Sequence, residues 1–435
     1  MSNTLSQRLS NRRLIVDVLA LMFGVGAWIG VNGIYVQLPL LVNTAPEGWG
    51  LPAHMVMLVQ IANLGPILYT LYTKYTSWVR DHYIIYALLG MASAAIFAMA
   101  FTYDKTSVVF GAEHSTALLG LMFLTAVVGC TSSVLFMPYM RNYREIYLVT
   151  YLVGEGLSGF VPSVAALVQG VGGNPECVNT TKPDAEIRSY MTVYPQPRFS
   201  IEIFFTLVGT LLFLSFLAFI GLNKLAVARG ERVKQPGSTE TLPTEMNAPP
   251  SYKTTAGWTM SKPLYNYLLC MMGVICFLGH STLPSIQSYS CLPYGNVAYH
   301  LTVTLASMAN PLAMCLGFVL KDPKSPNFLT WLTGAILILS SFVLYLAVQS
   351  PTPPFQGSWI GEFLVVISWV LVNGLIGFVK MGITTLFRPD PGRGLYYIGV
   401  ATQVGSLAGA IMIFVLVNHA GTFKSYEPCS ALMAH

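Results

Sequence analysis

The long apolar runs of this chain carry isolated polar side chains, most of them uncharged amides: Asn32, Gln37, Gln60, Asn63, Ser132, Ser133, Glu155, His280, Asn310, Asn373 and Gln403. An unsatisfied polar group costs several kcal/mol in hydrocarbon, so these side chains should face protein or a water-filled cavity. Amides present donors and acceptors together, which suits a neutral ligand with many hydrogen-bonding groups. The alternative for each amide taken alone is an interhelical hydrogen bond that holds a bundle together.

Aromatic side chains accompany the amides. Trp28, Asn32 and Tyr35 are spaced four and three residues apart and share one face of a helix, and Tyr151 lies in a later run. Such rings could stack on a flat ligand. An ordinary packing stripe is the alternative.

Ionisable groups inside the apolar runs are few. Glu155, in Gly154-Glu155-Gly156, falls near the middle of its run, where an ionisable side chain is functional by default. It could bind a ligand or carry a proton. Lys380 lies nearer an end, where it could snorkel or pair, and His280 is expected to be a hydrogen-bonded packing residue.

The stretch VNGIYVQLPLLV, residues 31–42, interrupts the first apolar run. Pro39 removes a backbone donor and Gly33 loosens the turn beside Asn32. Because a break is tolerated only where it lines protein or a cavity, we predict a gating or hinge segment at Gly33, Gln37 and Pro39.

Composition places these residues in membrane helices. The chain has 435 residues, 54% of them hydrophobic and 9% charged, whereas soluble domains carry about 25% charge. We predict an all-α integral membrane protein with eleven spans, listed by residue number: 14–41, 51–73, 82–102, 115–138, 145–169, 199–223, 264–286, 297–320, 327–349, 359–384 and 393–418. No nucleotide-binding, zinc or hydrolase motif occurs, so no enzyme, metal site or nucleic-acid partner is expected.

The positive charges predict the orientation. With residues 1–13 in the cytoplasm, only Lys105, Lys182, Arg188, Arg198 and Lys424 fall outside, which leaves eighteen of the 23 Lys and Arg residues inside. The domain prediction is a six-helix half at 14–227 with an outside loop at 170–198, a disordered cytoplasmic linker at 228–263, a five-helix half at 264–418 and an extracellular tail at 419–435.

Sequence features outside the spans agree with this orientation. Asn179-Thr180-Thr181 is a glycosylation sequon in the predicted outside loop. Cys177, Cys291 and Cys429 are also predicted outside, where disulfides form, and we predict Cys291–Cys429 as the pair. In the linker, Pro249, Pro250 and Tyr252 match a Pro-Pro-x-Tyr ligand of WW domains, with a plain Pro-rich linker as the alternative.

The two halves resemble each other weakly. A shift of 247 residues aligns Gly26 with Gly273, Pro46 and Gly48 with Pro293 and Gly295, Leu58 with Leu305, and Ala62-Asn63 with Ala309-Asn310. Parallel repeats are typical of transporters that bind substrate between the halves; chance identity in a biased composition is the alternative.

Longer motifs are more specific. MFGVGAWIGVNGIYVQLPLLV, PEGWGLPAHMVMLVQIANLGPIL, TSSVLFMPYM and GEGLSGFVPSVAALVQGVG resemble the animal riboflavin transporters along the spans of both halves. The resemblance implies an eleven-span carrier in the plasma membrane, arranged like nucleoside carriers of the major-facilitator type, that takes up riboflavin. Riboflavin would be the substrate, and no cofactor is expected.

The resemblance implies roles for Trp28, Asn32 and Pro39 and for the outer turn Glu47-Gly48-Trp49. This chain departs from the usual Val-Glu-Leu-Pro at Gln37, which puts a proton-linked role there in doubt. In span four it reads Ser133-Val134-Leu135 where relatives often have an Asn and a Thr. The predicted substrate-binding residues are Trp28, Asn32, Tyr35, Gln60, Asn63, Ser133, Tyr151, Glu155, Asn310 and Asn373, and Glu155 is also the predicted proton carrier. We expect alternating access by rocking of the two halves. The alternatives are a carrier for another flat neutral solute such as a nucleoside, and a membrane receptor, which the number of spans disfavours.

Overall fold

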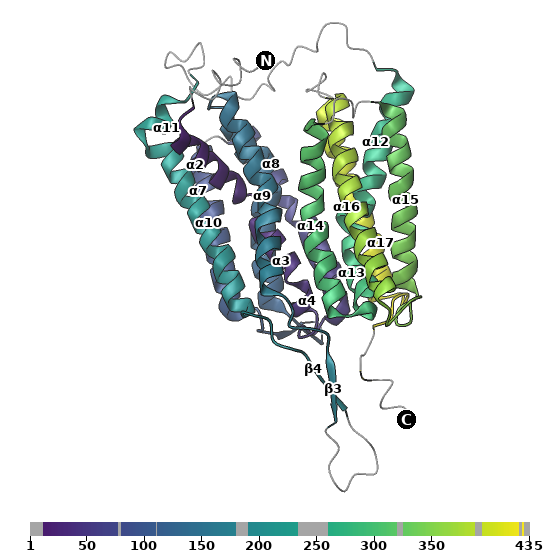
Figure 1. Cartoon of the computed structure of the whole chain (residues 1–435). Helices are drawn as coiled ribbons and strands as arrows, with labels where there is room; N and C mark the ends of the chain where they lie inside the picture. The colour runs from purple at the N-terminus through teal and green to yellow at the C-terminus, as the bar shows by residue number, and fades with distance from the viewer. Residues whose placement is uncertain are drawn as a thin grey trace.

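The chain folds into long helices that run side by side between two ends of the molecule (Figure 1). This computed structural model describes residues 12–76, 80–109, 111–179, 190–233, 260–319, 325–387, 394–425 and 429. The predicted WW-domain ligand and most of the predicted linker lie outside these residues. The helices form two groups, α2 to α11 and α12 to α17 (Figure 1).

The first group begins with a segmented helix: α2 (Leu14–Val25), α3 (Ile29–Val36) and α4 (Leu38–Leu41). The remaining helices of this group are the 3-10 turn Gly48–Gly50, α5 (Leu51–Ala62), α6 (Leu64–Tyr75), α7 (Asp81–Thr102), α8 (Thr116–Met140), α9 (Glu145–Gln169), α10 (Ile201–Lys224) and α11 (Ala226–Gly230). Its core centres on Phe23, whose ring lies 5.0 Å from Phe136 and 4.7 Å from Phe219. These contacts join α2 to α8 and α10.

The second group contains α12 (Lys262–Phe277), a π-helical segment (Leu278–Thr282), α13 (Leu283–Cys291), a 3-10 turn (Leu292–Tyr294), α14 (Asn296–Val319), α15 (Pro326–Val348), α16 (Trp359–Phe387) and α17 (Gly394–Asn418). Within it, α14 packs on α16, and α12 on α17.

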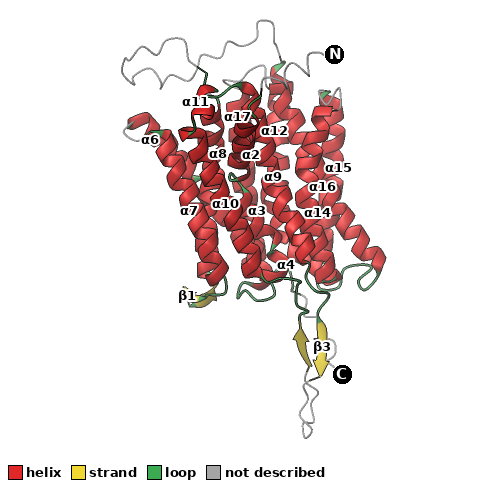
Figure 2. Ribbon diagram, turned by 60° about the vertical axis from the view of Figure 1, so that its left-hand side comes forward, coloured by secondary structure: helices red, strands yellow, loops and turns green. Residues whose placement is uncertain are grey.

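Two short hairpins complete the described chain. β1 (Ser107–Val109) pairs with β2 (Ala112–His114), and β3 (Glu176–Asn179) pairs with β4 (Tyr190–Val193), both antiparallel. The β3–β4 hairpin projects from one end of the helices (Figure 2). We call this the hairpin end, and the opposite one, at which α2 begins and α11 lies, the α11 end.

Among the described residues, nine helices are long and apolar enough to cross a membrane, and the bent pair α2 and α3 would make a tenth. The prediction of a multi-pass, helical membrane protein is therefore confirmed. Helix α14, of 24 residues, runs beside these helices but is not one of the nine. The predicted number of eleven spans stays a prediction.

The main break in the first span is not where we predicted it. Helices α2 and α3 meet at 53°, so the bend lies at residues 26–28, before Gly33. The hydroxyl of Ser215 on α10 donates to the carbonyl of Phe23 at 3.4 Å, and the amide of Ala27 bonds to Gly24 O instead. A side chain inserted into the helical ladder is a recognised cause of a kink. Gly26 permits the contact, because a Cβ there would lie 2.0 Å from Ser215 Oγ.

A second, smaller interruption lies where Pro39 predicts one. Helix α3 ends at Val36, α4 begins at Leu38, and the Gln37 amide bonds to Ile34 O in a 3-10 turn. Pro39 has no N–H for the carbonyl four residues earlier, so the α-helical ladder stops here. Gly33, by contrast, lies inside α3 and is buried against Val208 of α10, as a packing residue.

The predicted disulfide is wrong. Cys177 of β3 is bonded to Cys429, whereas Cys291 is a free, buried cysteine at the end of α13. Cys429 is one of the predicted partners, but a helix end that is packed inside the bundle keeps Cys291 away from it. The bond links the β3–β4 hairpin of the first group to the segment after α17 in the second group.

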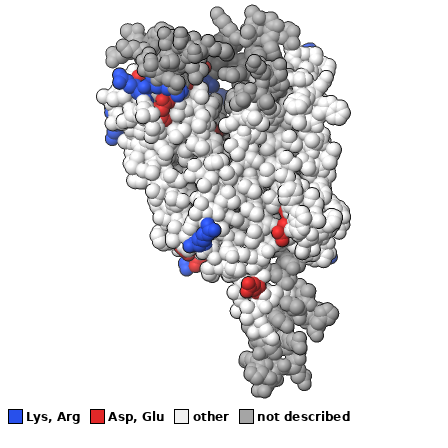
Figure 3. All heavy atoms as spheres, viewed as in Figure 1, with Lys and Arg blue, Asp and Glu red and all other residues white. Residues whose placement is uncertain are grey.

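Charged residues gather at the α11 end on the face shown in Figure 3. There Glu231 pairs with Arg144 at 2.9 Å and with Arg13 at 3.9 Å, and Arg12 pairs with Asp17 at 3.9 Å. The middle of the same face is almost free of charge, as expected for a surface in lipid.

Candidate functional site

The predicted residues of the first group come together around α9. The Nδ2 atom of Asn32 lies 3.4 Å from Ser158 Oγ, at the long end of hydrogen bonds, and Asn32 is half-buried. A Cβ added to Gly159 would lie 3.5 Å from Asn32 Nδ2 and 3.8 Å from Ser307 O of α14. Asn32 therefore lies where α3, α9 and the second group of helices meet, with hydrogen-bonding capacity to spare.

Two glycines bring Glu155 to the same place. Helices α2 and α9 approach so closely that a Cβ on Gly24 would lie 2.1 Å from Tyr151 O, and one on Gly154 2.1 Å from Leu21 O. The half-exposed Glu155 has no ion-pair or hydrogen-bond partner for its carboxylate among the described residues. The next residue, Gly156, faces Pro311 of α14. An unpaired carboxylate thus lies beside the second group.

The aromatic residues divide into two kinds. Trp28 is the residue before α3 and packs its indole against Gly129 of α8, where a Cβ would lie 2.8 Å from the ring. Trp28 and Tyr35 keep part of their surface exposed, but Tyr151 is fully buried and packs on Phe23 at 5.4 Å. Tyr151 therefore has a packing role in this structure, although its hydroxyl has no partner among the described residues.

Asn63 marks a break in the second span, between α5 and α6, and its Nδ2 lies 3.5 Å from Gln60 Oε1. Both side chains are half-buried. Ser133 is exposed and donates to Cys130 O of its own helix at 3.2 Å.

The amide of Asn310 on α14 binds the backbone of α16, whereas the amide of Asn373 binds the backbone of its own helix, α16. Asn310 donates to Asn373 O at 3.3 Å, and Asn373 donates to Trp369 O at 3.0 Å. Both are half-buried. For Asn310 this is the interhelical role that we gave as the alternative for each amide, and the side-chain oxygens of both residues are left for a ligand.

Gln37 belongs to a fixed contact within the first group. It is buried and donates from Nε2 to Gln169 Oε1 at 2.7 Å, and Gln169 in turn donates to Phe199 O at 3.1 Å. The contact ties the end of α3 to the end of α9 and the start of α10. Gln37 therefore joins helices of one group.

The two groups touch through the turn after α4, which the sequence analysis did not assign to a gate. Trp49 O accepts from Ser288 Oγ of α13 at 2.6 Å, and its ring meets Tyr289 at 5.8 Å. His54 of α5 meets Phe414 of α17 at 5.1 Å. We call these contacts the outer junction; all lie at the hairpin end.

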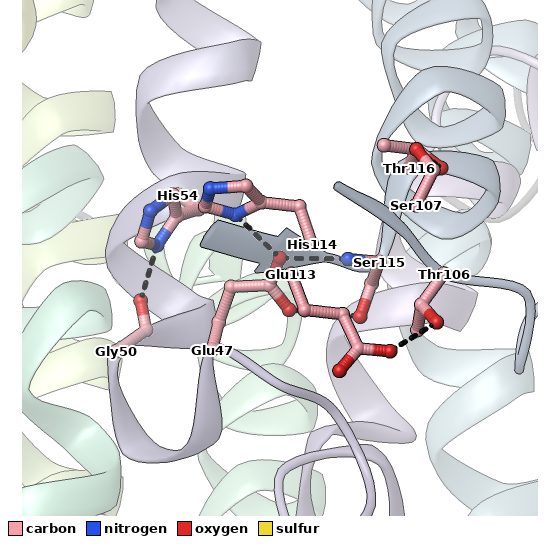
Figure 4. A network of polar contacts seen from close by, with 9 residues as sticks. All are labelled: Glu47, Gly50, His54, Thr106, Ser107, Glu113, His114, Ser115 and Thr116. Atoms are coloured by element: carbon pink, nitrogen blue, oxygen red, sulfur yellow. Dashed lines mark hydrogen bonds and ion pairs between the residues drawn. The ribbon is translucent and has the colours of Figure 1, made fainter. Parts of the chain in front are cut away.

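A buried carboxylate holds this turn in place (Figure 4). Glu47 accepts 2.8 Å hydrogen bonds from the backbone N–H and from the hydroxyl of Ser115, and its Oε1 lies 3.2 Å from Nδ1 of His114. Burial alone would raise the pKa of Glu47, but the hydrogen bonds from Ser115 and His114 outweigh it and hold the pKa below its usual range. The carboxylate is thus a charged anchor for the turn that carries Trp49.

A cavity of about 430 Å³ opens at the hairpin end between the end of α9 and the start of α14. Its lining includes Gln169, Gln196, Arg198 and His300, none of which we predicted. The imidazole of His300 is buried and its Nε2 has no partner among the described residues.

The ionisable residues of the second group form a pair that sequence reasoning missed. Lys380 of α16 turns inward and places Nζ 2.5 Å from His280 Nε2, so it does not snorkel. His280 Nδ1 lies 3.1 Å from Ser406 Oγ of α17. No sequence spacing signals this contact, because the residues lie on three helices far apart in the chain.

Comparison with known proteins identifies the fold and the family. The model of solute carrier family 52, riboflavin transporter, matches residues 12–425. The chain belongs to this family. It is 36% identical to the zebrafish (Danio rerio) riboflavin transporter member 3-A, over 96% of this chain and 98% of that protein. It is 35% identical to the human member 2, over 96% and 97%.

Solved structures agree on the architecture. A bacterial homologue of the lysosomal transporter Spinster superposes with a TM-score of 0.58 at 14% identity, covering 93% of this chain and 81% of that one. The nucleoside transporter NupG gives a TM-score of 0.51 at 12% identity, covering 93% and 90%. The predicted transporter fold, arranged as in nucleoside carriers, is confirmed, and membership of a transporter family supports a carrier over an enzyme.

Proposed function

We propose that this chain carries riboflavin across the plasma membrane into cells. The observation that carries the proposal is the family match over residues 12–425, together with relatives of nearly equal length that are named riboflavin transporters. The arrangement of polar groups around α9 supports it. No observation gives comparable support to the alternative that the chain is a membrane receptor.

The chemistry of riboflavin fits the half-buried residues where the groups meet. Its isoalloxazine is flat and suits stacking on Trp28 or Tyr35. Its dione edge presents acceptors beside a donor, which the amides of Asn32 and Asn310 complement. The ribityl hydroxyls need several small polar partners, and Gln60, Asn63, Ser133 and Asn373 are assigned to them. Tyr151 acts behind this surface by fixing α2 against α9.

Transport follows from alternate opening of the two ends. The outer junction joins the groups at the hairpin end through Trp49, Ser288 and Tyr289. Rocking of the two groups about the Asn32–Ser158 region would separate this junction and give substrate access from the hairpin side. Gln37, Pro39 and the bend at residues 26–28 would move with the first group.

The hairpin end is assigned to the outside of the cell. The positive charges near α11 favour that end as cytoplasmic. The disulfide Cys177–Cys429 belongs in an oxidising compartment. Asn179, exposed at the end of β3, is then the proposed glycosylation site.

Glu155 is the proposed proton-responsive carboxylate of the first group. Riboflavin is neutral, so uphill uptake needs a coupled ion, and Glu155 is an unpaired carboxylate beside the substrate region. Protonation would remove its charge as the groups close around substrate.

Radiolabelled riboflavin uptake by cells that express the chain tests this function. We expect saturable uptake that excess unlabelled riboflavin abolishes and nucleosides leave intact. If unlabelled nucleosides reduced uptake and unlabelled riboflavin did not, riboflavin would not be the substrate.

A further inference from the structure

The second group of helices contains a basic pair in its interior. His280 lies in the π-helical segment Leu278–Thr282, and Lys380 lies on α16, seven residues before that helix ends at Phe387. The Nζ and Nε2 atoms are 2.5 Å apart. A lysine inside a membrane helix normally has a carboxylate partner or faces a functional path.

Among the residues that the structure describes, no carboxylate forms an ion pair with Lys380 or His280. Asp and Glu are absent from the helices that surround the pair, which are α5, α12, α13, α14, α15 and α17. Glu362, at the start of α16, is about 27 Å away along the helix. On α12, the Cys276 thiol lies four residues before His280 in the chain.

The other titratable side chains on these helices are exposed or lie toward a helix end. Tyr267 and Cys270 of α12 and Cys315 of α14 are exposed, Lys262 begins α12, and Tyr299 lies near the start of α14. His54 begins α5 and belongs to the outer junction, His300 begins α14, and Tyr396 and Tyr397 begin α17. Tyr289 and Cys291 end α13 at the hairpin end, Tyr265 begins α12, and Tyr345 ends α15. The charge of the pair is therefore set mainly by its own two members.

The geometry fixes how many protons the pair can hold. Lys380 donates to Nε2 of His280, so Nε2 must carry a lone pair, and Nδ1–H then donates to Ser406 Oγ at 3.1 Å. A second proton on Nε2 would place two cations in contact and remove the acceptor. The hydrogen-bonded pair therefore carries one positive charge, on Lys380, while His280 is neutral. A second proton can bind only if the two side chains separate.

The local backbone can respond to such a separation. Pro284 lacks the N–H that an α-helix would offer to His280 O, and the chain forms a π-helical turn at this point. Single π-helical turns are frequent at functional sites. The segment also contacts α5 of the first group, and Ser281 Oγ donates to Ser406 O at 2.5 Å. A change at His280 would thus reach both α17 and the other group.

We propose that His280 and Lys380 form a proton-binding site in the second group of helices. With one proton the side chains are hydrogen-bonded and hold α12, α16 and α17 together, as in this structure. A second proton, taken from water, binds His280 Nε2, breaks the bond to Lys380 and frees the π-helical segment to move. The link to uptake rests on the proposed function, but the site itself does not.

A proton count on the purified chain in detergent tests the site without riboflavin. From about pH 8 down to about pH 4, a range that extends below that of an ordinary histidine because Lys380 opposes a second positive charge, the native chain should bind about one proton more than His280→Gln, because Gln keeps the acceptor but cannot titrate. In Lys380→Gln the same proton should bind at higher pH, because the neighbouring positive charge is gone. His419→Gln, at an exposed histidine after α17, is the matched control substitution.

Equal proton counts for the native chain and His280→Gln would overturn the site. It would also be overturned if Lys380→Gln bound the proton at the same pH as the native chain. Gel filtration confirms that each variant is folded, and the two substitutions test the pair independently. Riboflavin uptake then tests the link to transport. Its response to pH should change in both variants and not in His419→Gln. Failure of native uptake would reject the proposed substrate and leave the proton count to decide the site.

Discussion

Asn32 of α3 and Ser158 of α9 are joined by a long hydrogen bond of 3.4 Å at the point where α9 also meets α14. The bond uses one donor of the amide and leaves its oxygen free among the described residues. This relationship makes Asn32 the best-placed amide of the first group to bind a ligand between the two groups of helices.

Replacing Asn32 by Ala should lower riboflavin uptake by about ten- to a hundredfold, because one or two hydrogen bonds to substrate would be lost. Surface expression, measured by biotinylation, should stay normal. Asn43→Ala is the matched control, since Asn43 bonds only to Pro39 O of its own turn in the described structure. Native uptake by Asn32→Ala would remove it from the pocket.

Glu155→Gln should remove the part of the pH dependence of uptake that comes from this carboxylate. Gln keeps a similar shape and an acceptor, so riboflavin should still bind, which tryptophan fluorescence can measure. The reason is that Gln cannot exchange a proton near neutral pH. If uptake by the variant follows the native pH profile, Glu155 carries no proton in transport.

Glu47→Gln should loosen the outer junction. The lowered pKa of Glu47 means that its contribution to the free energy of unfolding is present above the usual carboxyl pKa and is lost as pH falls through the folded-state value. The variant should lose about 1.5–3 kcal/mol near neutral pH, as for hydrogen bonds to a buried charge, and the difference from the native chain should shrink in acid. Thermal unfolding at several pH values measures this.

Glu113→Gln is the control for that experiment. Its carboxylate, on β2, is exposed and accepts a hydrogen bond from Thr106, the residue before β1, so little change is expected. Equal unfolding temperatures for Glu47→Gln and the native chain at every pH would show that Glu47 does not anchor the junction.

Peptide mapping without reduction should find Cys177 linked to Cys429 and Cys291 as a free thiol. Cys177→Ser should free Cys429 for alkylation, whereas Cys291→Ser should leave the linkage unchanged. A linkage that includes Cys291 would contradict the structure of the hairpin end.

The sequence predicted the helices well because hydrophobic length is a strong local signal. The predicted run at 14–41 became α2 to α4, and Pro39 marked a true interruption. The larger bend at residues 26–28 was missed, because its cause is Ser215, almost two hundred residues later in the chain. Local sequence cannot show which distant hydroxyl enters a helical ladder.

Pairings across the fold were equally hidden. The spacing of the cysteines did not reveal that the end of α13 is buried, and nothing near Lys380 in the sequence indicated a contact with His280. Gln37, predicted to gate, is bound to Gln169. The sequence shows which polar residues lie inside the apolar runs, but the partners of these residues depend on how the helices pack.

The most direct measurement is uptake of radiolabelled riboflavin by cells that express this chain, at acidic and neutral pH and with and without sodium. We predict saturable uptake that is independent of sodium, greater at acidic pH, blocked by unlabelled riboflavin and unaffected by nucleosides. Uptake no greater than in cells without the chain, despite its presence at the surface, would contradict the account.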